Sequence, residues 1–274
     1  MKEAFPLGQT EEDQGALEAV QALMAKYRGP LTVEQISTGM KLCLKNARGL
    51  VFEAELLLKN QRRARAMSLA LTAIEELGKV HVLHSMARIP KKNQKLWRDR
   101  WTQFRSHEAK ASFAFPDTLP DEAFRFPDLI LAASIDNSLR TPVGERLRQA
   151  GLYVDWLSGD NRWLDPMQEI SEDNALSRIE IARQGLHRLE ALRNQGWFSA
   201  TVLKIAHEVL GPLNESMPKA AHVTSEHVSE QMGEFGPARR EFYVTVIKGG
   251  FVHLPDSFEI AGVPWREFLE HPDT

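Results

Sequence analysis

Residues 62–87 read RRARAMSLALTAIEELGKVHVLHSMA, and this stretch decides the fold. Its apolar residues recur every three or four positions, as they do on one face of an α-helix. That face holds Leu69, Ala73, Glu76, Val80 and Leu83. Lys79 lies one helical turn after Glu76 and four residues after Glu75. The stretch therefore predicts a long helix with an ionisable cluster, Glu75, Glu76 and Lys79, on or beside its buried face.

The ionisable cluster has two interpretations. Glu–Lys pairs at this spacing are common on helices, so the cluster could be no more than a set of surface and helix–helix ion pairs. A carboxylate within an apolar face favours a functional role instead, because a buried charge needs a partner. The residues alone leave both interpretations open.

Helical spacing continues on both sides of the central stretch. A helix is expected over residues 32–59, which begin with the capping-box pattern of Thr32 and Gln35. Further helices are expected over residues 91–112 and 171–194, and an irregular stretch lies between the last two. Long helices with short connections are typical of antiparallel bundles, so we predict an all-α fold.

The chain divides into three regions on this basis. Residues 1–30 are expected to be an N-terminal helical extension, residues 31–196 the helical domain, and residues 197–274 a small C-terminal accessory region. Within the accessory region, Gly211–Pro212 is expected to end a helix. Residues 242–254, with Gly249–Gly250 at the turn, are expected to form a β-hairpin.

Composition excludes several classes of protein. The chain of 274 residues is 43% hydrophobic and carries a net charge of −3, which argues against a dedicated duplex-DNA binder. Cys43 is the only cysteine, so no internal disulfide can form, and its apolar surroundings predict core packing in a reducing compartment. No segment has the length of a membrane span, and we expect a cytoplasmic protein without membrane contact.

Two polar residues interrupt an apolar face of the helix over residues 32–59. Asn46 and Glu53 share that face with Leu50 and Leu57, at spacings of four, three and four residues. An amide and a carboxylate beside leucines need polar partners inside the bundle. We therefore expect Asn46 and Glu53 to belong to a supporting polar network with Glu75, Glu76 and Lys79.

The helix over residues 91–112 carries the candidate catalytic residues. Arg100 and His107 are seven positions apart, which places them on one helix face about 10 Å apart along the axis. Lys110 lies one turn after His107. A phosphate between Arg100 and His107 would be within reach of both side chains. Taken alone, His107 would more often be a structural histidine than a catalyst.

Basic and aromatic residues alternate on the same helix. Lys95, Arg98 and Arg105 are candidate RNA contacts, with Trp97 and Trp101 between them. The ordinary interpretation of such a charge run is a solvated helix face. Three later aromatic residues are expected to be packing anchors rather than base-stacking platforms: Tyr153, Trp156 and Trp163.

Several motifs of common enzyme classes are missing from the sequence. A Glu-x-x-His pair in the register of a di-iron bundle, a nucleophile elbow, a phosphate-binding glycine loop and a zinc-type cysteine set are all absent. We therefore expect no metal and no cofactor.

Four motifs together resemble the AbiV family of bacterial abortive-infection proteins over residues 32–194. They are Asn46-Ala47 with Glu53-Ala54-Glu55-Leu56-Leu57-Leu58, Glu75-Glu76-Leu77-Gly78-Lys79, His107-Glu108-Ala109-Lys110, and Tyr153-Val154-Asp155-Trp156 with Trp163 and Pro166. This family is related to the HEPN helical bundles. The resemblance implies a HEPN-like bundle, a role in phage defence, and Asp155 as a further member of the polar network.

Active HEPN proteins are typically dimeric, metal-independent ribonucleases with an Arg-x(4–6)-His motif. Arg100 and His107 match its widest form, with six residues between them. The resemblance thus implies a homodimer in which His107 transfers protons, Arg100 holds the phosphate and Lys110 adds positive charge. Glu76 would orient His107 or Lys110.

A non-catalytic binding protein is the competing hypothesis. It would sense a phage product or block the host translation machinery, and the polar residues would only specify helix packing. A nucleotide-binding pocket is a third, less favoured possibility. Solvent exposure of the Arg100 and His107 side chains separates the first two hypotheses, because a catalytic pair must line an accessible basic cleft.

Overall fold

The computed structural model describes residues 27–106, 148–157, 161–216, 237–260 and 262–271. The helices of the first part of the chain are α2 (Val33–Lys59), α3 (Arg63–Met86) and α4 (Gln94–Arg105). A hairpin follows, made of β1 (Asp155–Leu157) and β2 (Arg162–Leu164), and then α8 (Pro166–Glu169) and α9 (Glu172–Asn194). The C-terminal elements are α10 (Ala200–Ser216), α12 (Pro237–Lys248), β3 (Glu259–Ile260), β4 (Val263–Pro264) and α13 (Trp265–Glu270).

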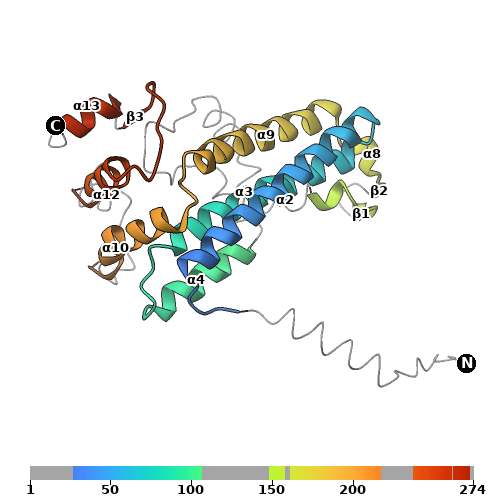
Figure 1. Ribbon diagram of the computed structural model, residues 1–274. Helices are drawn as coiled ribbons and strands as arrows, with labels where there is room; N and C mark the ends of the chain where they lie inside the picture. The colour runs from blue at the N-terminus through green and yellow to red at the C-terminus, as the bar shows by residue number, and fades with distance from the viewer. Residues whose placement is uncertain (1–26, 107–147, 158–160, 217–236, 261, 272–274) are drawn as a thin grey trace, which may run out of the picture.

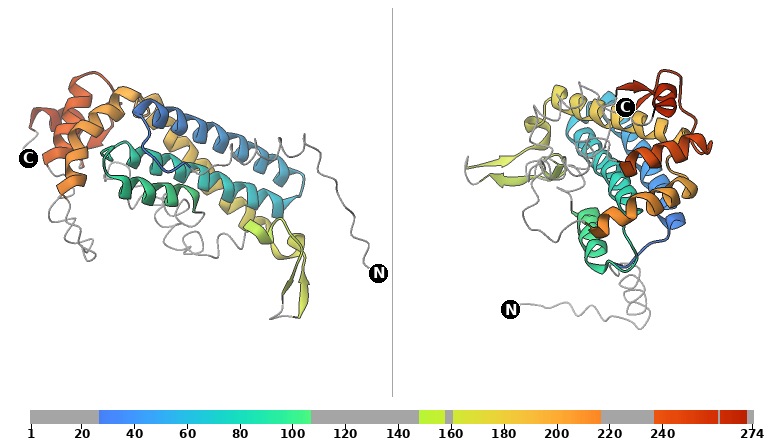
Figure 2. Two further views of the ribbon diagram at one scale, coloured as in Figure 1. Left: turned by 90° about the horizontal axis from the view of Figure 1, so that it is seen from below. Right: turned by 90° about the vertical axis from the view of Figure 1, so that its left-hand side faces the viewer.

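The three long helices α2, α3 and α9 lie side by side and form the body of the molecule (Figures 1 and 2). Capping side chains fix two of their starts. Thr32 and Gln35 make the predicted capping box of α2, and the Ser171 hydroxyl accepts a hydrogen bond from the Asn174 backbone N–H at the start of α9. The prediction of an all-α bundle is confirmed.

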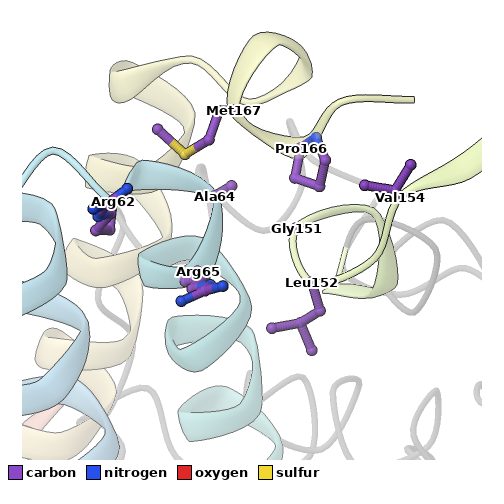
Figure 3. Close-up of a pocket in the computed structure, with 8 residues that line it drawn as sticks. All are labelled: Arg62, Ala64, Arg65, Gly151, Leu152, Val154, Pro166 and Met167. Atoms are coloured by element: carbon purple, nitrogen blue, oxygen red, sulfur yellow. The ribbon is translucent and has the colours of Figure 1, made fainter. Parts of the chain in front are cut away.

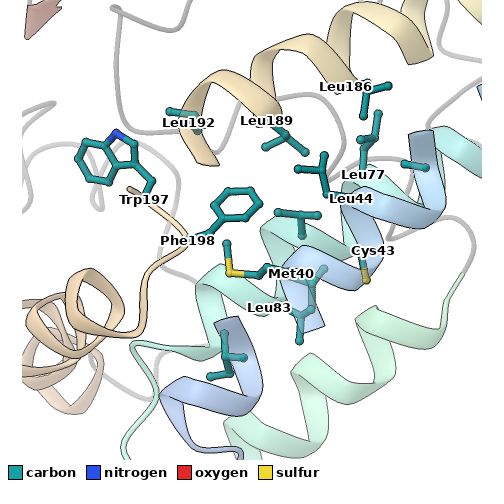
Figure 4. Close-up of a cluster of buried hydrophobic side chains, with 14 of the residues drawn as sticks. Met40, Cys43, Leu44, Leu77, Leu83, Leu186, Leu189, Leu192, Trp197 and Phe198 are labelled. Atoms are coloured by element: carbon teal, nitrogen blue, oxygen red, sulfur yellow. The ribbon is translucent and has the colours of Figure 1, made fainter. Parts of the chain in front are cut away.

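α3 is the most deeply buried of these helices. No residue from Ala66 to Met86 is exposed, because α2, α4 and α9 all pack against it. Leucines from three helices and Phe198 meet in the core that Figure 4 shows. α9 approaches α3 closely at Gly185, where an added Cβ would lie 3.0 Å from Leu77 Cδ1. Gly185 therefore allows the close contact between α3 and α9.

The C-terminal region shares this core instead of packing separately. Trp197 and Phe198 are buried in it, and the Ser37 hydroxyl on α2 donates a hydrogen bond of 2.6 Å to the Phe198 carbonyl. His207 Nδ1 on α10 lies 2.9 Å from the Ala87 carbonyl beyond the end of α3. These contacts tie α10 to both α2 and α3.

Two predictions for the C-terminal region were wrong in position. α10 continues through Pro212, because buried Leu203 and Leu210 hold the helix against the core and proline removes only one backbone hydrogen bond. Residues 242–247 are helical within α12, where Phe242, Tyr243, Val246 and Ile247 form one buried helical face. The region does contain a β-hairpin, but β3 and β4 form it.

The stretch expected to be irregular contains a second hairpin. β1 and β2 pair with Trp156 opposite Trp163 and extend away from the bundle beside α8 (Figure 2). The two indole rings pack edge to face at 5.3 Å between centroids, yet Tyr153 and Trp163 are more than 60% exposed. The prediction that these aromatic residues anchor the core was therefore wrong.

The expected N-terminal helix falls on residues that lie almost wholly outside those described. Among the helices that the structure does describe, none combines the length and apolar character needed to cross a membrane.

Replacing Ser37 by alanine is expected to destabilise the protein by about 1–3 kcal/mol, because the buried Phe198 carbonyl loses its donor. The free energy of unfolding from urea titration measures this. Thr38→Ala is the matched control on the same helix, since Thr38 is exposed. Equal stability of the Ser37→Ala and Thr38→Ala variants would contradict the importance of this hydrogen bond.

Candidate functional site

Glu76 and Lys79 form an ion pair on α3, at the seam with α2 and α4. Both side chains are largely buried, at 12% and 21% exposure. The Lys79 ammonium also lies over the Phe104 ring of α4, 5.5 Å from its centroid. Packing and pairing account for both residues, which favours the structural interpretation of this pair.

Cys43 on α2 completes this cluster. Burial raises the pKa of its thiol to about 11, and the Glu76 carboxylate beside it adds to the shift. The thiol is therefore protonated at neutral pH and unreactive. The prediction that Cys43 packs in the core is confirmed.

Glu75 points away from Glu76, because neighbouring helical residues differ in direction by about 100°. Its side chain is buried, and one carboxylate oxygen lies 3.9 Å from Arg148 Nε. The two glutamates therefore do not converge on one site.

Arg100 lies on the inner side of α4. Burial lowers the pKa of its guanidinium, the neighbouring Asp99 acts in the opposite direction, and Nη1 donates a 2.6 Å hydrogen bond to Gln103. Its charge also reaches Arg88, just beyond the end of α3. Burial, then Arg239 of α12, then Arg100 lower the pKa of Arg88 to about 10. We call Arg88, Arg100 and Arg239 the arginine cluster.

Two histidines adjoin this cluster on α3. Burial lowers the pKa of His81 to about 4 and that of His84 to about 3, with further contributions from Arg188 and Arg88 respectively. Both rings are therefore neutral at pH 7. Sequence reasoning did not select them, although their spacing from Leu77 and Arg88 places all four on one helix face.

The candidate catalytic residues are only partly placed. α4 ends at Arg105, and Ser106 has an extended backbone with φ −75° and ψ 128°. The expected continuous helix over residues 91–112 is therefore too long, and the alignment of Arg100 with His107 stays a prediction. The cause is local, because the chain leaves the helix at its C-cap. His107 and Lys110 themselves lie outside the described residues.

The basic face of α4 differs from expectation in its aromatic residues. Lys95 and Arg98 are exposed, but Arg105 donates to the Tyr27 carbonyl and lies over Trp101. Trp97 and Trp101 are buried core residues whose indole N–H groups donate to the Pro90 and Gly29 carbonyls. They cannot stack on bases from these positions.

Three members of the predicted polar network lie on the surface. Asn46 and Glu53 are exposed on α2, so the expectation that they face the inside of the bundle was wrong. The apolar face that they share with Leu50 and Leu57 is only the half-buried edge of the core. Asp155 lies in the β1–β2 hairpin, at the other end of the bundle from α4, where it accepts a hydrogen bond from the Trp156 N–H (Figure 1).

Two cavities lie away from the arginine cluster. One of about 220 Å³ opens between the start of α3 and the β1–β2 hairpin, where Arg62 and Arg65 face Leu152 and Met167 (Figure 3). The other, about 670 Å³, is a groove between α2 and α9. Within the described part of the chain, no group of three His, Cys, Asp or Glu residues is placed to hold a metal.

Comparison with known proteins gives one match. A family model described as AbiV, of the HEPN group, matches residues 35–187, which is more than half of the chain. No curated protein and no solved structure matches. The matched residues include α2, α3, α4 and nearly all of the bundle.

Protonation of His84 links stability to pH. The pKa is about 3 in the folded chain against an ordinary 6.5, so below pH 6.5 the unfolded chain binds more protons and stability falls until the pH reaches about 3. His84→Gln is expected to flatten this decline, by at most about 1.4 kcal/mol per pH unit. The measurement is the free energy of unfolding from urea titrations between pH 7 and pH 4.

His253→Gln is the control for this experiment, because His253 is exposed in the C-terminal region. The control is expected to keep the pH dependence of the parent. Parallel stability curves for the parent and His84→Gln would contradict a buried, neutral His84.

Proposed function

The chain belongs to the AbiV family of HEPN-type proteins, and on this premise we propose that it acts in abortive infection of phage-infected cells. In this proposal the protein is a cytoplasmic homodimer whose ligand is RNA, which it cleaves without a metal ion. The alternative partners are a phage protein or a component of the host translation machinery.

The arginine cluster is the observation that carries the RNA proposal. Arg88 just beyond the end of α3, Arg100 of α4 and Arg239 of α12 act on one another electrostatically, because Arg239 and Arg100 add to the effect of burial in lowering the pKa of Arg88. A phosphate offsets the repulsion between such groups, and guanidinium geometry suits two phosphate oxygens. Lys95 and Arg98 are exposed on the outer side of α4, about 140° and 160° around the helix from Arg100, where they would contact other phosphates of the same RNA.

The proposed reaction is transfer of the phosphodiester to the ribose 2′-oxygen. The 2′-oxygen bonds to phosphorus, the 5′-oxygen leaves, and a 2′,3′-cyclic phosphate remains. His107 takes the 2′-hydroxyl proton or gives one to the leaving oxygen, and Arg100 stabilises the charge on the phosphorane. Lys110 adds a positive charge. Water makes the other of these two proton transfers, and the reaction needs no oxidant, reductant or metal.

The Glu76–Lys79 pair has a supporting role in this proposal. Lys79 lies against Phe104, one turn after Arg100 on α4, so the pair fixes the position of α4 on α3. It therefore positions Arg100 without touching RNA. Glu75 lies near Arg148 on an adjoining face of α3.

The exposed β1–β2 hairpin favours the second candidate function, a binding protein without catalysis. Tyr153, Val154 and Trp163 are each more than 60% exposed, and the Asp155 carboxylate accepts a hydrogen bond from the backbone N–H of Trp156 in the same strand. Exposed aromatic residues are enriched in protein interfaces. In this alternative the hairpin binds a phage product or a host protein.

Cleavage of total cellular RNA by the purified chain in excess chelator tests the proposal. Arg100→Ala and His107→Ala are each expected to lower the cleavage rate at least about 100-fold, because each removes a group that acts on the reacting phosphate. Arg100→Lys is expected to be intermediate, since it keeps the charge but loses the planar donor fork.

Lys248→Ala is the matched control, because Lys248 is an exposed cation at the end of α12 and has no role in the proposed reaction. Thermal unfolding confirms that each variant folds. Cleavage that survives in the Arg100 and His107 variants would contradict the assigned roles. No cleavage by the parent, with or without phage lysate, would favour the binding protein.

A further inference from the structure

α2 presents an uncovered apolar stripe on the side opposite the core. Leu42, Phe52 and Leu56 are 60%, 65% and 51% exposed, and Lys45 and Gly49 lie between them. The five positions follow a spacing of three or four residues along four turns, which is the spacing of a helix–helix seam. Figure 2 shows α2 along the outer edge of the bundle. We call these five residues the α2 outer face.

Gly49 is the second observation. Glycine in the middle of a helix is destabilising relative to alanine, because it loses more backbone freedom on folding. Apart from the neighbouring backbone of α2 itself, nothing in the described part of the chain lies within 4 Å of the position where a Cβ would be. Packing among the described residues therefore gives no reason for glycine here, whereas a close helix–helix contact at Gly49 would.

We propose that the α2 outer face binds the same face of a second copy, with the two α2 helices antiparallel and the two Gly49 residues at the twofold axis. This proposal rests on the homodimer of the proposed function and names its interface. A twofold contact of this kind uses one surface of each copy and closes on itself.

The sequence of α2 is complementary to itself in this register. With the twofold axis at Gly49, each residue lies opposite the partner residue whose number brings the sum of the two to about 98. Leu42 therefore meets Leu56 of the partner subunit. Lys45 lies beside Phe52 and Glu53 of the partner subunit. The first half of the exposed face carries Lys41 and Lys45, and the second half carries Glu53 and Lys59. An antiparallel pair brings Lys45 near Glu53 of the partner subunit, whereas a parallel pair would place Lys45 beside its own copy.

The contact also gives a role to two exposed residues of the predicted polar network. Asn46 and Glu53 lie on the same edge of the α2 outer face, seven residues apart. In the antiparallel register Asn46 comes level with Glu53 of the partner subunit, so its amide can donate to that carboxylate. Their partners are then in the second copy and not inside the bundle.

Cysteine cross-linking tests the register on the full-length chain. Gly49→Cys places two thiols at the twofold axis, within disulfide range for closely packed helices. Leu42→Cys is the matched control on the same face, because in this register its two copies are about 21 Å apart along the helix axis. The parent controls for Cys43, which is buried. A mild oxidant and a short bis-maleimide are applied to each protein.

Gly49→Cys is expected to give covalent dimers with both reagents. Neither Leu42→Cys nor the parent is expected to give covalent dimers. Links in both variants would indicate a parallel or unspecific contact, and links in neither, together with unchanged dimerisation of Lys45→Glu, would show that this face is not the interface. Either result overturns the proposal.

A charge exchange gives an independent measurement. Lys45→Glu or Glu53→Lys alone is expected to raise the dimer dissociation constant roughly tenfold, and the double variant to restore it. Light scattering at several protein concentrations measures this dissociation constant. RNA cleavage is measured on the same proteins, so that a parent that is monomeric and still cleaves RNA overturns only this interface, and a cross-linked dimer without cleavage overturns only the nuclease.

Discussion

Burial of α3 on all sides is the constraint on which the rest of the structure depends. The helix carries Glu75, Glu76, Lys79, His81 and His84 within a stretch that has no exposed residue. Each of these ionisable groups needs a partner of opposite charge or must become neutral. The structure uses both solutions, because Glu76 pairs with Lys79, Glu75 lies near Arg148, and the histidine pKa values fall until the rings are neutral.

This constraint determines where the protein can bind an anion. Just beyond the end of α3, Arg88 is itself buried, and its pKa falls because of this burial and of the cations Arg239 from α12 and Arg100 from α4. The accessory region is therefore part of the candidate site, since it supplies Arg239 and shares the core through Trp197 and Phe198. One face of α2 stays exposed to solvent, and this is the face that we propose binds a second copy of the chain.

The sequence predicted α2, α3 and α9 well, because long periodic stretches with capping residues such as Thr32 and Ser171 specify helices locally. Prediction from the sequence failed where tertiary contacts determine the local structure. Phe242 to Ile247 has the composition of a strand, but its helical face packs on Trp197. Periodicity also showed that Asn46 and Glu53 share a face without showing that this face lies at the edge of the core. Arg239 and His84 could be assigned only once α12 and α3 were placed together.

The central claim is that the arginine cluster holds RNA phosphates, and the salt dependence of RNA affinity tests it most directly. Binding of a single-stranded oligonucleotide is measured for His107→Ala and for His107→Ala with Arg88→Gln, at several salt concentrations. The account predicts weaker binding and a slope of log affinity against log salt that is smaller by about 0.7, which corresponds to one lost phosphate contact. Equal affinities and equal slopes for the two proteins would contradict it.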